Sequence, residues 1–429
     1  MPEVTVGASL HISLRDAATV VAEVLRGRSL GAAIEHAGDS GVESPRAALV
    51  DLTHGTLRCY GRLQAITRAL ARKGGAVDPL VESLLWCALY ALWSGRYAPY
   101  TVVDQAVRAC IGLERHAAKG FVNGMLRSYQ RESAALDARF AQDLEYRWQH
   151  PGWWVEAVRT AWPHTWQAVL AAGNQHPPMT LRVNRRRIAA DAYLAKLASA
   201  GIGVSEAEAQ AVRLERPLPV DRLPGFAEGE VSVQDAGAQR AAAWLDLAAG
   251  MRVLDACAAP GGKCAHVLEH AEVKLTALDI DAQRCSLIES NLSRLGLSAQ
   301  VLCADASQPD NWWDGKPYER ILADVPCSGS GVVRRHPDMK WLRRASDLKG
   351  FAQRQADILD ALWRALAPGG KLLYVTCSVF PEENDAVLDA FCQRTPAARR
   401  LALPAGAAPQ LLPGPGHDGF HYALLGRSG

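Results

Sequence analysis

The stretch that decides the fold is residues 252–263, RVLDACAAPGGK. It opens with a short apolar strand pattern at 252–255, passes through a loop with two glycines, and is followed by a helix pattern at 264–270. A strand, a glycine-containing loop and a helix in this order are typical of the first unit of a doubly wound α/β domain. The glycines do not follow the G-x-G-x-x-G spacing, which argues against a dinucleotide as the ligand of the loop.

The alternation of strand and helix patterns continues from this stretch to the end of the chain. Further apolar strands are predicted at 274–279, 299–303, 320–324, 371–375 and 420–425. Strands that are apolar on both faces and separated by helices are typical of parallel sheets covered by helices on both sides. We therefore expect residues 236–429 to form an α/β domain with a Rossmann-like, doubly wound parallel sheet.

The chain before residue 236 has a different character. Residues 1–145 carry helix patterns, such as the strongly apolar 81–93, and weak strand signals, which predicts an all-α domain. Residues 146–235 combine a strand pattern at 179–184 with a helix pattern and several prolines, which predicts a small α+β connector. The sequence thus predicts three domains.

The composition is that of an ordinary globular protein, with 21% charged and 49% hydrophobic residues among 429. The net charge is only +2, so any basic surface for a nucleic acid must be local. The ten cysteines form no CxxC pair and no metal-ligand spacing, which favours reduced thiols, no metal and a cytoplasmic location. No apolar stretch has the length of a membrane span, and we expect no membrane partner.

Four acidic residues are predicted at the carboxyl ends of strands: Asp255, Asp279, Asp305 and Asp324. Ligands of doubly wound sheets bind at this edge, where Asp279 would accept hydrogen bonds from ribose hydroxyls and Asp305 from an adenine amino group. Each aspartate alone could instead be a helix cap or a turn residue. The set of four favours a ligand site, and S-adenosylmethionine is the ligand that fits it best.

Two cysteines follow two of these strands, Cys327 in DVPCSG and Cys377 in YVTCS. A single cysteine is more often a small buried apolar residue, but this pair is expected to meet at one edge of the sheet. A thiolate that adds to carbon 6 of a pyrimidine makes carbon 5 nucleophilic enough to accept a methyl group. Lys263 would favour the thiolate, and Asp324 would bond the base near its N3. These residues alone do not tell which of the two cysteines acts as the nucleophile.

A basic segment with a tryptophan follows the Pro-Cys loop. Arginine and lysine side chains would pair with RNA phosphates, and the tryptophan would stack on a base. The alternative is a solvated charged helix with a tryptophan in the core. The candidate RNA-binding residues are Arg334, Arg335, Lys340, Trp341, Arg343 and Arg344.

Several motifs together resemble the RNA cytosine-5 methyltransferases of the Sun/Fmu/NOL family, over nearly the whole chain. They are DACAAPGGK from residue 255, DVPCSGSG from 324, RRHPDMKWLRR from 334, LAPGGKLLYVTCSVFPEEN from 366 and DGFHYALL from 418. The helical N-terminus, with KGFVNGMLR from residue 119, resembles a NusB-type RNA-binding domain.

The resemblance implies that Cys377 is the nucleophile, that Cys327 helps to release the product, and that Lys263 and Asp324 also meet the target base. It implies 16S ribosomal RNA as the substrate. We also expect the protein to be a monomer. The same chemistry on transfer RNA, or a non-catalytic RNA-binding assembly factor, remain alternatives; the intact cysteine pair argues against the second. The implied cofactor contacts are Cys257, Ala258, Ala259, Pro260, Gly261, Gly262, Lys263, Asp279, Asp305 and Asp324.

Overall fold

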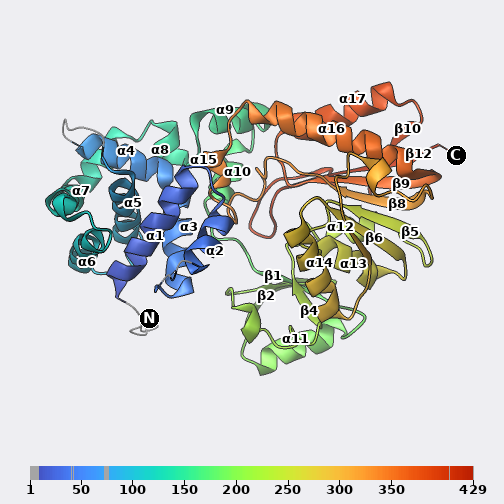
Figure 1. The fold of residues 1–429 in the computed structure, drawn as a ribbon, viewed down its shortest axis with the longest axis horizontal. Helices are drawn as coiled ribbons and strands as arrows, with labels where there is room; N and C mark the ends of the chain where they lie inside the picture. Colours follow the sequence, from blue (N-terminus) through green and yellow to red (C-terminus); the bar gives the residue numbers. More distant parts are fainter. Residues whose placement is uncertain (1–8, 40, 42, 72–76, 405, 429) are drawn as a thin grey trace. The chain divides into compact units, whose positions relative to one another are not determined.

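The computed structural model describes residues 9–39, 41, 43–71, 77–404 and 406–428 (Figure 1). They fold as two compact units. The helical unit comprises the described residues up to Gln175 together with Val333–Ala345, and the α/β unit comprises the described residues of His176–Val332 and from Ser346 onward. The predicted division into domains at residues 145 and 235 stays a prediction. In the described part of the chain, no helix is both long and apolar enough to cross a membrane.

The helical unit packs around α5, whose side chains are buried on nearly all sides. Pro79 opens this helix and the Asp78 side chain accepts hydrogen bonds from its first amides, which explains where it begins. The helices are α1 (Leu10–Leu25), α2 (Leu30–Asp39), α3 (Arg46–Arg58), α4 (Tyr60–Leu70), α5 (Pro79–Trp93), α6 (Pro99–Gly112), the 3-10 helix η1 (His116–Ala118), α7 (Lys119–Arg139), α8 (Leu144–Trp148), α9 (Gly152–Ala161), α10 (Trp166–Gly173) and α15 (Met339–Leu342).

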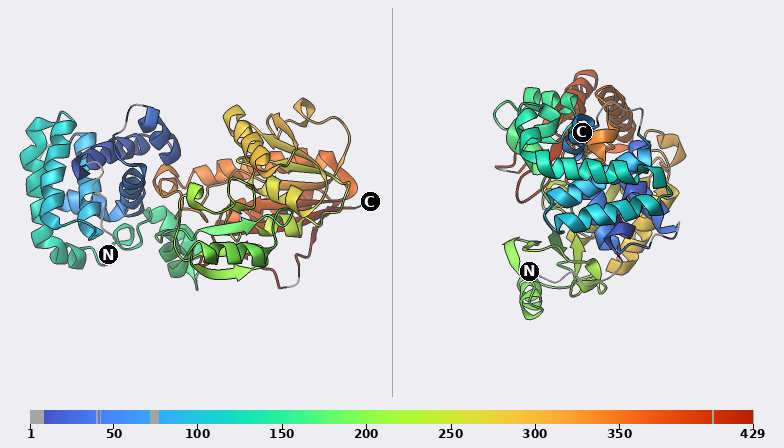
Figure 2. Two further views of the ribbon diagram at one scale, coloured as in Figure 1. Left: turned by 90° about the horizontal axis from the view of Figure 1, so that it is seen from below. Right: turned by 90° about the vertical axis from the view of Figure 1, so that its left-hand side faces the viewer.

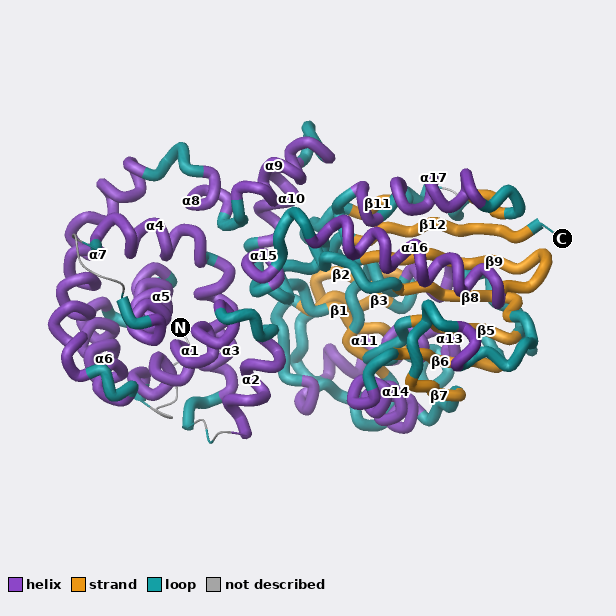
Figure 3. The backbone as a smooth tube through the Cα atoms, turned by 45° about the horizontal axis from the view of Figure 1, so that its top comes forward, coloured by secondary structure: helices purple, strands orange, loops and turns teal. Residues whose placement is uncertain are grey.

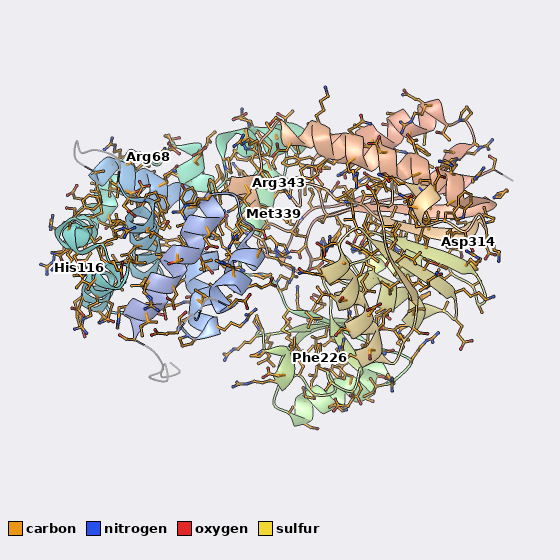
Figure 4. All side chains as sticks on the ribbon, in the orientation of Figure 1. Arg68, His116, Phe226, Asp314, Met339 and Arg343 are labelled. Atoms are coloured by element: carbon orange, nitrogen blue, oxygen red, sulfur yellow. The ribbon has the colours of Figure 1, made fainter. Side chains whose placement is uncertain are left out.

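Segment 333–345 belongs to the helical unit, although it follows strand β8 (Tyr318–Asp324) of the α/β unit in the sequence. Met339 and Arg343, labelled in Figure 4, mark the short helix α15 of this segment and the residue that follows it. The Asp338 carboxylate accepts the amide of Leu30 at the start of α2 (2.9 Å), and the Trp341 indole donates to the carbonyl of Leu57 near the end of α3 (2.7 Å). The segment thus satisfies backbone groups that helix ends leave unpaired.

The α/β unit begins with a small antiparallel sheet in the order β2-β3-β1-β4. Tyr193 and Leu197 of its helix are buried against Leu181 and Val183 of the central strand, so the helix covers one face of the sheet (Figure 2). The elements are β1 (Thr180–Val183), α11 (Ala190–Ser199), β2 (Val204–Glu208), β3 (Ala211–Leu214), η2 (Val220–Arg222) and β4 (Val231–Val233).

The large sheet has the order β10-β12-β9-β8-β5-β6-β7. The five strands from β9 to β7 are parallel, whereas β12 is antiparallel to β9 and also pairs with β10 and β11. The predicted doubly wound fold is confirmed, with an antiparallel edge. The elements are α12 (Arg240–Trp244), β5 (Arg252–Ala256), α13 (Gly262–His270), β6 (Lys274–Asp279), α14 (Ala282–Leu295), β7 (Gln300–Cys303), η3 (Pro309–Asn311), β8 (Tyr318–Asp324), α16 (Asp347–Ala365), β9 (Leu366–Thr376), η4 (Pro381–Glu383), α17 (Asp385–Arg394), β10 (Ala398–Leu401), β11 (Gln410–Leu411) and β12 (Phe420–Arg427).

Helices cover both faces of this sheet (Figure 3). Val253 and Leu322 point into the core formed with α12, α13 and α14, while their neighbours Leu254 and Ile321 point into the core formed with α16 and α17. Because successive side chains of a strand face opposite sides, both positions must be apolar, as the sequence pattern indicated.

A buried ion pair joins the small sheet to the large one. The Arg182 guanidinium of β1 is fully buried and makes two hydrogen bonds to the Glu269 carboxylate of α13, at 2.8 and 2.7 Å. Its remaining nitrogen donates to Gln234 and to the carbonyl of Gly262. Farther along the same junction, the Arg294 guanidinium lies over the ring of Phe226, which Figure 4 labels, with 4.1 Å to the ring centroid.

Candidate active site

The carboxyl edge of the parallel strands brings the predicted site residues together. Strand register places the end of β5 beside the ends of β6 and β8, and the end of β8 beside that of β9. Loop 257–263 follows β5, Asp279 and Asp324 end β6 and β8, and Cys377 follows β9. The fold therefore gathers residues that lie up to 120 positions apart, in the region where doubly wound domains bind their ligands.

Loop 257–263 has a backbone that the surrounding structure fixes. Cys257 and Gly261 have φ values of 61° and 94°, and the bond between Ala259 and Pro260 is cis. The Ala258 amide donates to the carbonyl of Leu278 on β6 (2.8 Å). A Cβ atom at Gly261 would lie 3.2 Å from a backbone atom of the neighbouring helix α14, so this position combines a positive φ with a close approach and favours glycine.

Two of the predicted cofactor residues are already held by protein groups. Asp279 is buried and accepts the amide of Ala259 on the loop (3.1 Å). Asp305 accepts hydrogen bonds from Ser307 and from Arg354 of α16. Burial alone would raise the pKa of Asp305, but these hydrogen bonds outweigh it and lower the pKa. Each carboxylate has about four acceptor positions, so both retain capacity for ribose or adenine donors.

Asp255 is a site residue whose burial the sequence did not reveal. It is fully buried near the end of β5, and within the described residues neither carboxylate oxygen has a hydrogen-bond partner. Burial, with a contribution from the charge of Asp324, raises the pKa of Asp255 well above its usual value. An acidic edge with an unpaired buried carboxyl and a glycine-bearing loop fits a cationic ligand with hydroxyl and amino groups, and S-adenosylmethionine is such a ligand.

Lys263 and Asp324 form an ion pair at the centre of the site. The Lys263 ammonium lies 2.6 Å from the Asp324 carboxylate, and both side chains are largely buried. Burial alone would lower the pKa of Lys263, but the charge and the hydrogen bond of Asp324 raise it, with further contributions from Cys377 and Asp255. Lys263 is therefore a stable cation whose charge acts on Cys377.

Cys327 and Cys377 lie in contact, as their positions after neighbouring strands predicted. Their sulfur atoms are 3.3 Å apart, both residues are free cysteines, and both are partly accessible. The hydrogen bond with Cys377 raises the pKa of Cys327 well above its usual value, and burial and the negative charge of Glu383 add to this effect.

Glu383 is a site residue that the sequence did not single out. It ends η4 and is fully buried beside both cysteine loops, whereas its neighbour Glu382 is exposed. The motif VFPEEN contains both glutamates, and nothing in the pattern tells which of them faces inward. Burial raises the pKa of Glu383, although hydrogen bonds from Ser328 and Ser378 oppose the rise.

The basic segment is used differently from what the sequence suggested. Lys340 is fully buried, and its ammonium donates to the carbonyls of Arg58 and Gln149 and to the side-chain oxygen of Asn174, at 2.7–3.1 Å. The Trp341 ring packs edge-on against Tyr60, with 4.9 Å between the ring centroids.

Arg334 is also buried, with 1% of its surface exposed. Arg334 and Lys340 are thus buried and Trp341 is partly buried within the helical unit, and the RNA contacts of these three residues stay a prediction. Arg335, Arg343 and Arg344 keep accessible surface, and their RNA contacts stay a prediction.

Comparisons with known proteins agree with this arrangement. Residues 242–426 match the family described as 16S rRNA methyltransferase RsmB/F, residues 150–221 the ferredoxin-like domain of RsmF/B-like methyltransferases, and residues 13–131 the NusB family. The fold of PH0851, a solved structure with 22% identity, has a TM-score of 0.80 and covers 97% of this chain and 98% of that one. A methyltransferase homolog from Pyrococcus horikoshii, 25% identical, has a TM-score of 0.58 over 66% of this chain and 98% of its own.

Curated relatives match over almost the entire chain. Ribosomal RNA small subunit methyltransferase B of Pseudomonas putida is 45% identical, with 95% of this chain and 97% of the relative covered. The protein of the same name from Vibrio cholerae is 42% identical, with 98% of each chain covered. The chain therefore belongs to the ribosomal RNA small subunit methyltransferase B family, whose methyl donor is S-adenosylmethionine.

Proposed function

We propose that the protein methylates carbon 5 of a specific cytosine in 16S ribosomal RNA through a covalent bond between Cys377 and the base. The observation that carries this proposal is the contact of two thiols, 3.3 Å apart, beside the Lys263–Asp324 ion pair at the edge of the sheet that also holds loop 257–263. Methyl transfer to a nitrogen, which is already nucleophilic, requires neither thiol. Carbon 5 of cytosine is a poor nucleophile, and its methylation needs an added nucleophile.

The charges around the two sulfurs support Cys377 as the nucleophile. The ammonium of Lys263 acts on Cys377, and a neighbouring cation favours a thiolate. The carboxylate of Glu383 acts on Cys327, and a neighbouring anion opposes ionisation. In this proposal Cys377 is the thiol that attacks the base, and Cys327 lies beside it as its hydrogen-bond partner.

The proposed reaction has three steps. The Cys377 thiolate forms a bond to carbon 6, the electron pair of the carbon 5–carbon 6 double bond becomes a carbon 4–carbon 5 double bond, and N3 takes up a proton from water. Carbon 5 then forms a bond to the methyl group that S-adenosylmethionine supplies, and S-adenosylhomocysteine leaves. Water then takes the carbon 5 proton, the carbon 5–carbon 6 double bond forms again as the bond from carbon 6 to sulfur breaks, and N3 gives its proton back to water, which leaves 5-methylcytosine and the thiolate.

The other site residues have supporting roles in this scheme. Asp324 bonds the base near N3 and its amino group, and Lys263 holds Asp324 in place and favours the Cys377 thiolate. Cys327, in contact with Cys377, assists release of the product. The cofactor is held by Cys257, Ala258, Ala259, Pro260, Gly261, Gly262, Lys263, Asp279, Asp305 and Asp324.

The target cytosine must leave its base stack to reach a thiol at the sheet edge, so the substrate is a single-stranded or flipped nucleotide. We propose that the protein acts as a monomer in the cytoplasm, and that Arg335, Arg343 and Arg344 contact RNA phosphates.

The test is methyl transfer from labelled S-adenosylmethionine to unmethylated 16S RNA and to small-subunit particles, followed by nucleoside analysis. The proposal predicts label in 5-methylcytosine with the wild type and none with Cys377→Ala. Label in another nucleoside, full activity of Cys377→Ala, or transfer to transfer RNA alone would refute it.

A further inference from the structure

One buried carboxylate that contacts neither the base nor the cofactor in the reaction proposed above contacts the loops of both cysteines. Glu383 has no exposed surface, and it lies in η4, six residues beyond Cys377. Burying a charged group costs free energy unless several hydrogen bonds compensate for the lost water. The buried carboxylate of Glu383 therefore needs hydrogen-bond donors from the protein.

The carboxylate of Glu383 accepts hydrogen bonds from the residue that follows each cysteine. One oxygen accepts the amide of Ser328 (2.7 Å) and a weaker bond from Gln355 of α16 (3.4 Å). The other oxygen accepts the hydroxyl of Ser328 and the hydroxyl of Ser378, each at 2.6 Å. A single side chain thus ties the loop of Cys327 to the loop of Cys377.

All four of these partners are donors, and this fact explains why the residue is a glutamate. An ionised carboxylate only accepts hydrogen bonds, whereas the amide of a glutamine would turn an NH₂ group toward two of the donors. Since both hydroxyls point at Glu383, the hydroxyl of Ser330 donates to the Ser378 oxygen (3.0 Å) and accepts the amide of Val379 (2.8 Å). The hydrogen bonds that these hydroxyls donate therefore all point toward Glu383, which fixes each hydroxyl as donor to its neighbour.

The negative charge of Glu383 also acts on Cys327. It is among the groups that raise the pKa of Cys327, after the hydrogen bond with Cys377 and burial.

We propose that Glu383 is a positioning residue for methyl transfer, which holds the loops of Cys327 and Cys377 together and thereby keeps the two sulfur atoms in contact. This inference rests on the proposed function and adds a residue to its machinery. Glu383 does not touch the base or the cofactor in this account; it acts through Ser328 and Ser378.

The test compares Glu383→Gln with Glu382→Gln, a matched control in the same turn whose side chain is exposed. Misplacement of a reacting group by about 1 Å costs on the order of 100-fold in rate. We therefore expect kcat for methyl transfer to fall about 10- to 100-fold in Glu383→Gln, with the KM values for RNA and S-adenosylmethionine within about threefold of wild type. Glu382→Gln should keep the wild-type kcat.

A second readout needs neither RNA nor cofactor, so it separates this inference from the proposed function. In a Cys377→Ala background, the alkylation rate of Cys327 by iodoacetamide is followed against pH with and without Glu383→Gln. Loss of the carboxylate should move the alkylation profile to lower pH, which a purely structural role of Glu383 would not do. If Glu383→Gln does not fold, Ser378→Ala, which removes one of the two hydroxyl donors, should lower kcat in the same way.

An unchanged alkylation profile together with a kcat within twofold of wild type would overturn the inference. Equal loss of kcat in Glu382→Gln would overturn it as well, because the effect would not be specific to the buried carboxylate. If the wild type makes no 5-methylcytosine, the proposed function fails, while the alkylation profile still decides the role of Glu383.

Discussion

Replacing Arg182 by methionine should destabilise the α/β unit strongly, because it leaves a charge buried without its partner. Arg182 is fully buried, and the side chain of Glu269 is 4% exposed, so water does not replace the lost guanidinium. Removing one member of a buried ion pair typically costs about 3–5 kcal/mol. In a domain of roughly 150–250 residues, 1 kcal/mol lowers Tm by about 2–4 °C, so the expected decrease is about 6–20 °C.

The assay is differential scanning calorimetry with and without S-adenosylhomocysteine. The transition that the ligand shifts to higher temperature belongs to the unit that binds it. Arg182 also donates to the carbonyl of Gly262 in the cofactor loop, so Arg182→Met should weaken ligand binding severalfold. Arg186→Met, which alters an exposed arginine in the turn after the same strand, is the matched control and should leave Tm unchanged.

The double variant Arg182→Met/Glu269→Gln tests the cause of this loss. If the uncompensated carboxylate is responsible, neutralising it should restore at least half of the lost stability. A decrease in Tm below 2 °C for Arg182→Met, or a double variant no more stable than the single one, would refute the reasoning.

Three further predictions concern other parts of the molecule. Burial lowers the pKa of Lys340 to about 7, so the contribution of Lys340 to stability is present above the unfolded pKa of about 10.4 and is lost as pH falls to about 7. The free energy of unfolding of wild type relative to Lys340→Met, from urea unfolding, should therefore increase as pH is raised from about 7 to about 10.4. A difference that does not change with pH would contradict this. Asp324→Asn, which breaks the ion pair with Lys263, should lower kcat at least about 100-fold at saturating substrates, and near-normal turnover would exclude the proposed role. Diamide should oxidise Cys327 and Cys377 to an intramolecular disulfide that abolishes activity until dithiothreitol is added, and a peptide map without that disulfide would contradict the contact of the two sulfurs.

The fold of the α/β unit was predictable because its strands are apolar on both faces and alternate with helices. Val253 and Leu254 are neighbours that enter different cores, which is the arrangement that such a pattern predicts. The antiparallel direction of β12 was not predictable, because an apolar run such as 420–425 is expected both for a parallel and for an antiparallel strand.

The sequence also allowed us to predict that the site residues lie close together, because residues that follow neighbouring parallel strands meet at one edge of the sheet. The order of strands places the ends of β8 and β9 side by side, and Cys327 and Cys377 with them. The burial of Asp255 and Glu383 depends on side-chain packing from distant segments, which a local pattern does not contain.

The basic segment has a structural role that its composition does not reveal. A run of arginine, lysine and tryptophan is typical of an exposed RNA-binding surface. Here Lys340 and Trp341 instead satisfy carbonyls at the end of α3, which are 282 and 284 residues away in sequence. Helix ends leave unpaired carbonyls that attract cations and donors, and no local signal shows that a distant lysine will supply them.

The central claim is that Cys377 forms the covalent bond to RNA while Cys327 assists release. Its most direct test incubates 16S RNA and S-adenosylmethionine with Cys327→Ala and with Cys327→Ala/Cys377→Ala, followed by denaturing electrophoresis and peptide mapping. The account predicts a protein–RNA adduct that survives denaturation in the single variant, mapped to Cys377, and no adduct in the double variant. An adduct that maps to another residue, or that persists without Cys377, would contradict it.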